Sequence, residues 1–233
     1  NSNNNFTILK DNLFFRNITF QNFQILKMIS FLVRDKNWKN YDPKILNYEE
    51  NFDSSLEYIF DLEYGITEIL KTRNTILFFE NSITLSSEGK FLTNFWTNRI
   101  GFNLLIPLQN HVGSNIIVTK EDEVKEEKKF PEFITPDQPF LKFKKLTYTL
   151  DDSLLVNINF EGILFEMEDQ RNWGDASYKI YSGSLLDPFP YLEKEGSNFS
   201  QTVKIDVVNK KQRSFPSKNI VKIDHTTPYK FPK

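Results

Sequence analysis

Most of the side chains whose types and spacing could do chemistry fall within twenty residues, from 160 to 179. This stretch holds five acidic groups, an arginine, a tryptophan and a lysine. Side chains alternate along an extended chain, so Glu166 and Glu168 share one face and Asp169 lies on the other. Two carboxylates on one face can act as an acid/base pair where burial separates their pKa values. We therefore predict that the catalytic groups lie among these three residues.

The same stretch offers groups that could hold a ligand. The guanidinium of Arg171 can bind a carboxylate through two parallel hydrogen bonds, and the indole of Trp173 can pack on the apolar face of a sugar. After Asp169 the composition becomes turn-like, which places residues 170–175 at a strand end or loop, where function tends to lie. The predicted substrate-binding residues are Arg99, Arg171, Asn172, Trp173, Asp175 and Lys179.

A purely structural interpretation of these charges stays open, because ion-pair networks also collect charged residues. In that interpretation Arg171 and Lys179 neutralise Asp169, Glu168 and Asp175, and Trp173 fills the core. Arg99 enters an apolar strand and needs a partner, which we expect among Glu166, Glu168 and Asp169.

A second group, Arg34, Asp35 and Trp38, could join the functional surface. The alternative is a local contact between Arg34 and Asp35, with Trp38 in the core. His111 lies in a polar loop and is expected to be solvated rather than catalytic, and His225 lies near the end of the chain.

Composition excludes several classes of protein. The 233 residues carry a net charge of −2, which gives no general electrostatic case for binding nucleic acid or an anionic membrane. Without cysteine there is no disulfide or zinc-thiolate site, and the two histidines lack the spacing of a local metal motif. No apolar run approaches about 18 residues. We expect a cytoplasmic protein that needs no metal and no cofactor.

The chain contains one alanine and 23 phenylalanines, which argues against a helical bundle and favours half-buried strands. Alternation predicts a strand over 154–165, and a helical pattern over 56–70, interrupted by Gly65, competes with a strand there. The mixed-charge run 120–129 is expected to be an exposed loop or hairpin tip. The other predicted strands are 14–20, 25–33, 75–79, 83–87, 103–106 and 115–119.

Strands at such short intervals favour an all-β fold with at most one or two short helices. We expect a mainly antiparallel β-sandwich, either simple or of the large supersandwich kind. Residues 1–208 would form this domain. The polar, proline-dotted residues 209–233 would be an extended segment leading toward a second domain.

The run Phe165–Asp175 resembles a signature of the D-apionate lactonase family, FEMEDQRNWTDASFKTY, with Gly174 in place of threonine. The segment 98–102 resembles the family's NRIGF element, and 130–140 resembles its FP-x-x-I-x-P-x-QPF run. The resemblance extends over roughly residues 18–208. One departure is Ile106, where the family usually has a histidine.

The resemblance implies hydrolysis of a sugar-acid lactone, with a small carbohydrate or lactone as ligand. It also implies that the β-rich part precedes a glycosidase-like barrel in the same or a partner chain, so that this chain alone would form one wall of the site. Two other functions stay open: a non-catalytic carbohydrate-binding or scaffolding domain, and a mutarotase-like sugar epimerase.

Overall fold

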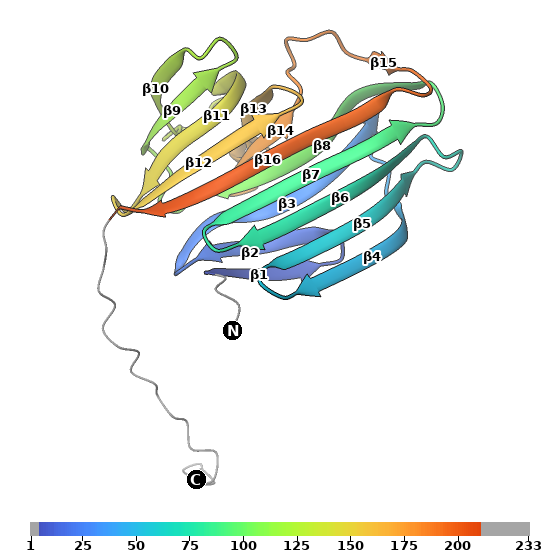
Figure 1. Cartoon of the computed structure of the whole chain (residues 1–233). Helices are drawn as coiled ribbons and strands as arrows, with labels where there is room; N and C mark the ends of the chain where they lie inside the picture. The colour runs from blue at the N-terminus through green and yellow to red at the C-terminus, as the bar shows by residue number, and fades with distance from the viewer. Residues whose placement is uncertain (1–4, 211–233) are drawn as a thin grey trace, which may run out of the picture.

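The computed structural model describes residues 5–210, in which sixteen strands form one sheet (Figure 1). Every ladder between the described strands is antiparallel. The predicted all-β, antiparallel fold is therefore confirmed. Within residues 5–210 no helix is long and apolar enough to span a membrane. His225 and nearly all of segment 209–233 lie outside the described residues.

The strands run in chain order as β1 (Phe6–Asp11), β2 (Phe14–Phe20), β3 (Phe23–Asp35), β4 (Lys44–Phe52), β5 (Leu56–Tyr64), β6 (Leu70–Phe79), β7 (Ser82–Phe91), β8 (Phe95–Pro107), β9 (Asn115–Lys120), β10 (Lys125–Lys129), β11 (Phe140–Leu150), β12 (Leu154–Glu161), β13 (Phe165–Asp169), β14 (Ser177–Ser182), β15 (Tyr191–Glu193) and β16 (Asn198–Asn209). A 3-10 helix, η1 (Gln170–Trp173), lies between β13 and β14.

The sheet curls back on itself, so that two layers face each other (Figure 1). Its main path follows the order β1-β2-β3-β8-β14-β13-β11-β12-β16-β7-β6-β5-β4. Aromatic contacts join the layers: Phe15 of β2 lies 4.8 Å from Tyr58 of β5, and Phe31 of β3 lies 5.8 Å from Phe199 of β16, measured between ring centroids. The core between the layers is thus held by apolar burial and ring packing.

The alternative of a helix over 56–70 is wrong. In β5 the side chains of residues 58, 60, 62 and 64 are buried and those between them are less so, which is the period of a strand. Gly65 follows with φ +86° and makes the turn toward β6.

The single strand predicted over 154–165 is in fact two strands, β12 and β13. Gly162 separates them with φ +93°, and a Cβ there would lie 2.3 Å from the carbonyl oxygen of Ser200. Strands β12 and β13 pair one after the other with the same edge of β11, β12 over residues 145–150 and β13 at Phe143 and Phe140, while β9 pairs with the opposite edge. This break carries Glu166 and Glu168 away from the long β12–β16 ladder and beside β14.

Gly101 allows β8 to pack against the opposite layer. It has φ +137°, and a Cβ would lie 2.4 Å from Ser182 Oγ and 2.5 Å from Gln201 Oε1. The Phe102 amide donates to that same Gln201 oxygen at 2.7 Å. A side chain at position 101 would therefore displace a hydrogen bond that ties β8 to β16.

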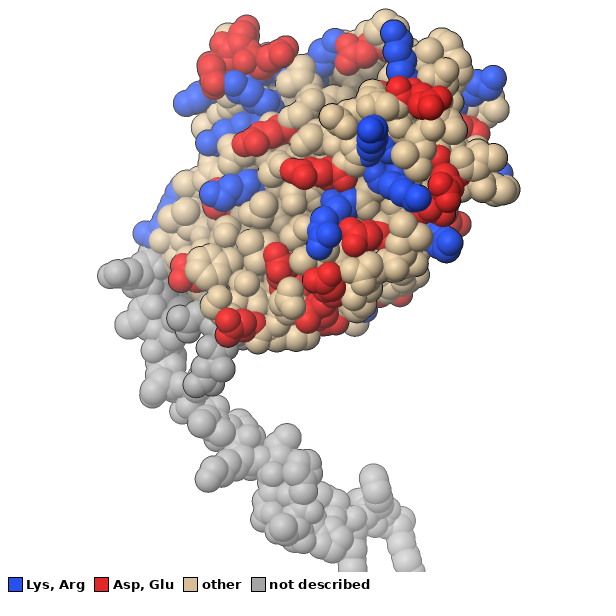
Figure 2. Space-filling view, turned by 45° about the vertical axis from the view of Figure 1, so that its right-hand side comes forward, with Lys and Arg blue, Asp and Glu red and all other residues tan. Residues whose placement is uncertain are grey.

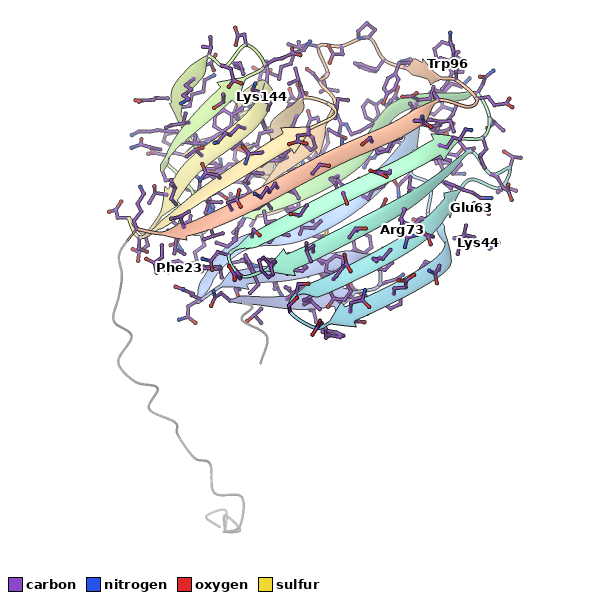
Figure 3. The ribbon with its side chains drawn as sticks, viewed as in Figure 1. Phe23, Lys44, Glu63, Arg73, Trp96 and Lys144 are labelled. Carbon is purple, nitrogen blue, oxygen red and sulfur yellow. The ribbon has the colours of Figure 1, made fainter. Side chains whose placement is uncertain are left out.

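The charged run 120–129 lies at a hairpin, as expected, with β9 and β10 joined by a turn at residues 121–124. At the other end of the sheet every residue of the edge strand β4 is exposed. Lys44 and Lys71 both approach Glu63 there, near Arg73 (Figure 3). Charges of this kind discourage further strand pairing. On the face shown in Figure 2, basic and acidic side chains intermingle.

Candidate functional site

A depression of about 550 Å³ brings together side chains from β3, β8, β13 and β14 and from the loops beside them. The lining residues are Arg34, Trp38, Arg99, Gln138, Glu168, Gln170, Trp173, Lys179, Tyr181 and Leu185. Strand pairing explains the convergence, because Glu168 lies opposite Lys179 on β14 and Arg34 lies opposite Arg99 on β8. The outcome is a cationic depression with aromatic walls.

Arg99 lies on an aromatic ring and not against a carboxylate. Its guanidinium carbon is 3.6 Å from the ring centroid of Tyr181 and 5.2 Å from that of Trp38, and its side chain makes no ion pair with a described residue. Of the carboxylates expected as its partner, Glu166 and Glu168 act on Arg99 through their charge without forming an ion pair, and a cation–π contact is its direct interaction. Burial lowers the pKa of Arg99, as does the charge of Arg34, while Tyr181 and the charges of Glu166 and Glu168 partly oppose the shift.

Glu168 is held by two donors on the wall of the depression. Lys179 Nζ lies 2.5 Å from one carboxylate oxygen, and Trp173 Nε1 donates to the other at 2.8 Å. Burial alone would raise the pKa of Glu168, but the hydrogen bonds from Lys179 and Trp173 outweigh it and lower the pKa below its ordinary value. Glu168 is therefore ionised at neutral pH, which suits an acceptor or a base and not an acid.

Asp169 and Arg171 form a clamp on the loop that follows Phe130. Arg171 donates to both carboxylate oxygens of the fully buried Asp169, at 2.9 and 2.7 Å. Its remaining donors reach the carbonyl oxygens of Pro131, Glu132 and Phe133. Two stretches that carry the family resemblance, 165–175 and 130–140, are thereby bound to each other.

Glu166 is fully buried behind the depression. Its carboxylate accepts hydrogen bonds from the Tyr181 hydroxyl at 2.6 Å, the Ser184 hydroxyl at 2.5 Å and the Leu185 amide at 2.9 Å. These bonds fix the ring on which Arg99 lies and the start of the loop that bears Leu185. As expected, Glu166 faces the same side of β13 as Glu168.

The other predicted site residues lie around the clamp. Asn172 donates to the carbonyl oxygen of Thr135, and Asp175 pairs with Lys27 of β3. Trp173 is 75% exposed at the rim of the depression and does not fill the core. The structural interpretation therefore holds for the two ion pairs Arg171–Asp169 and Lys179–Glu168, but not for Asp175 or Trp173.

The structure brings four of the predicted site residues into the depression: Arg99, Glu168, Trp173 and Lys179. It adds Gln138, Gln170, Tyr181 and Leu185, which sequence reasoning missed although all four fall in or near the motif stretches. Arg34 and Trp38 join this surface, whereas Asp35 instead accepts hydrogen bonds from the amides of Asn37 and Lys39.

The structure corrects the expectation for His111 and places Ile106. His111 is fully buried against Phe130 and Tyr148, so the prediction of a solvated residue is wrong. The rings of Phe130 and Tyr148, which are distant from His111 in sequence, pack against it, so the polar composition of the loop around His111 gave no sign of its burial. Ile106, where the family usually has histidine, lies in the core and does not line the depression.

Residues 4–210 match the sequence model of the N-terminal domain of D-apionate lactonase. The chain is also 34% identical, over 181 residues, to the D-apionate lactonase of Brucella anthropi. This chain belongs to the D-apionate lactonase family. The alignment covers 76% of this chain and 30% of the Brucella protein, so the chain spans less than a third of the relative that it matches.

Solved structures similar to this member of the D-apionate lactonase family show the fold alone. A glycoside hydrolase family 97 enzyme from Pseudoalteromonas, in complex with acarbose, superposes with a TM-score of 0.56 at 9% identity, over 87% of this chain and 34% of that one. A galactose mutarotase-like protein from Lactobacillus casei superposes with a TM-score of 0.52 at 6% identity, over 87% of this chain and 100% of that one. The curled antiparallel sheet is thus shared with proteins of very different sequence.

Proposed function

We propose that this chain is the β-domain of a sugar-acid lactone hydrolase and that its depression forms the carbohydrate-binding wall of the site. The observation that carries this proposal is the convergence of Trp38, Trp173 and Tyr181 with polar groups in one depression, in a chain of this family. Aromatic faces pack on the C–H surface of a sugar, and amide and charged groups bind its hydroxyls.

The residues in and around the depression take roles that fit their contacts. Trp173 and Trp38 would pack on the sugar, and Gln138 and Gln170 would bind hydroxyls. Glu168, ionised and held by two donors, is the carboxylate that could accept a proton or a hydroxyl hydrogen bond. Asp169, Arg171, Asn172, Asp175 and Glu166 would position these groups, because their polar atoms already bind protein partners.

The second candidate function is a non-catalytic carbohydrate-binding or scaffolding domain. This function is favoured by two of the predicted catalytic carboxylates, because Glu166 and Asp169 are fully buried and already accept hydrogen bonds from the protein. In both cases we expect further catalytic groups from a glycosidase-like barrel, within the same gene product or a partner chain, acting in the cytoplasm. Sugar epimerisation receives less support, because His111 is buried away from the depression.

The test compares the complete gene product with the 233-residue chain in the hydrolysis of small aldonolactones, followed as acid release in a pH-stat. We expect turnover by the complete product and binding without turnover by the chain.

Glu168→Gln in the complete product should lower kcat at least tenfold if Glu168 accepts a proton. Glu126→Gln on β10 is the matched control and should leave kcat unchanged. Absence of lactone hydrolysis by the complete product would rule out the lactonase proposal.

A further inference from the structure

Two arginines lie directly opposite each other on neighbouring strands. Arg34 of β3 and Arg99 of β8 are register partners, and both line the depression. Like charges that face each other across a ladder destabilise a sheet. No side-chain carboxylate in the described part of the chain forms an ion pair with either of them.

The depression also collects buried donors that lack an acceptor. Arg34 Nε, Arg99 Nε and Gln170 Nε2 are buried without a hydrogen-bond partner, and Arg99 is only 7% exposed. The guanidinium of Arg171, by contrast, donates to Asp169 and to three carbonyl oxygens. Buried donors without acceptors are costly, so these three indicate a ligand that supplies acceptor atoms.

The side chains that line the depression carry a net positive charge, since Arg34, Arg99 and Lys179 face one carboxylate. That carboxylate, Glu168, is already bound by Lys179 and Trp173. Glu166, behind the wall, has its oxygens bound by Tyr181, Ser184 and Leu185. The two guanidinium groups therefore remain for a ligand, and a guanidinium binds a planar carboxylate through paired, charge-assisted hydrogen bonds.

We infer that Arg34 and Arg99 form a subsite for the carboxylate of a small polyhydroxy acid, with Gln170 as a further donor and the tryptophans against the carbon chain. This inference rests on the proposed function only in placing the carbohydrate in this depression. A lactone is neutral, and its hydrolysis yields an acid that is ionised at neutral pH. The subsite thus selects the open acid over the lactone, and a hydrolase built on this domain retains its product.

The test measures binding of sodium gluconate and sodium threonate to the 233-residue chain by titration calorimetry, with the neutral alditol glucitol and inorganic phosphate as comparisons. The two aldonates should bind at least about tenfold more tightly than glucitol, because only they carry the charge. Raising the ionic strength to about 0.15 M should weaken the aldonates and not glucitol.

Arg99→Gln and Arg34→Gln should each lower the affinity for gluconate by roughly tenfold or more. Arg73→Gln, on β6 at the other end of the sheet (Figure 3), removes an equal charge and should change nothing. The thermal midpoint of the Arg34 variant should equal or exceed that of the native chain, since repulsion between the two arginines is relieved, whereas a purely structural pair would lower it. The Arg99 variant also loses the contacts of its guanidinium with Tyr181 and Trp38, so its affinity in the folded state is the readout.

Equal affinity for gluconate and glucitol, no binding of either aldonate, or unchanged binding in both variants would overturn the inference. Phosphate binding tighter than that of both aldonates would assign the subsite to phosphate esters instead. None of these outcomes depends on turnover, so they are distinct from a failure of lactone hydrolysis in the complete gene product.

Discussion

The guanidinium groups of Arg171 and Arg99 are chemically identical but have different surroundings. Arg171 donates to Asp169 and to three carbonyl oxygens, whereas Arg99 lies on the ring of Tyr181 without a carboxylate. The first arginine is therefore suited to fixing a loop and the second to meeting a ligand. Arg171 lies in the 3-10 helix η1, beside the loop that it binds, whereas Arg99 lies within strand β8 and lines the depression.

The clamp makes a residue-scale prediction. Arg171→Gln should lower the free energy of unfolding by about 3 kcal/mol, because it leaves the carboxylate of Asp169 buried and unpaired. Urea denaturation measures this. Arg73→Gln, an exposed arginine with long surface contacts, should shift stability by no more than about 0.5 kcal/mol. Equal midpoints for the native chain and the Arg171 variant would contradict the assignment.

Strand β8 connects the two layers of the sheet at Gly101. A methyl group there meets Ser182 Oγ and Gln201 Oε1 at 2.4 and 2.5 Å, and φ +137° is a conformation that L-residues rarely adopt. The NRIGF element therefore has a physical reason for its glycine, two residues from Arg99.

Gly101→Ala should lower the free energy of unfolding by roughly 3 kcal/mol through strain and the loss of the Phe102–Gln201 hydrogen bond. Chemical denaturation measures the change. Gly196→Ala separates strain from crowding, because Gly196 also has positive φ but nothing lies within 4 Å of its added Cβ. It should cost about 1 kcal/mol. If both variants lost equal stability, the packing argument at β8 would be wrong.

Tertiary packing changes the pKa of His111, and with it the pH dependence of stability. Burial lowers the pKa of His111 to about 4, from an ordinary value of 6.5. Above pH 6.5 the histidine is neutral in the folded and unfolded states. As the pH falls from 6.5 to 4 only the unfolded state takes up the proton, so stability declines by about 3 kcal/mol over that window.

His111→Asn should remove this decline, because an amide can donate to the Gln109 carbonyl but does not titrate. The measurement is the free energy of unfolding of both chains between pH 4 and pH 7. The stability lost by the variant at neutral pH should shrink as the pH falls. His225 is present in both chains and cancels. Parallel pH profiles would show that His111 is not the group that titrates.

Much of this protein follows from local sequence. Scarce alanine, abundant phenylalanine and the alternation of apolar with polar residues predicted an all-β antiparallel fold. The pattern is visible in the sequence because successive residues of a strand lie on opposite faces of the sheet. The Phe165–Asp175 stretch predicted the family, and three of its residues, Glu168, Gln170 and Trp173, line the candidate depression. Where two patterns fitted one segment, as over 56–70, only the ladder between β5 and β6 and the turn at Gly65 decided for a strand.

The tertiary structure alone decided which charges are free. Arg34 and Arg99 are 65 positions apart and become neighbours through the β3–β8 ladder, and Gln138 arrives on a loop held by Arg171. Sequence placed carboxylates and arginines in one motif but could not tell which would pair. Ion pairing depends on which strands lie side by side, and long-range ladders set that order in a sheet of this topology.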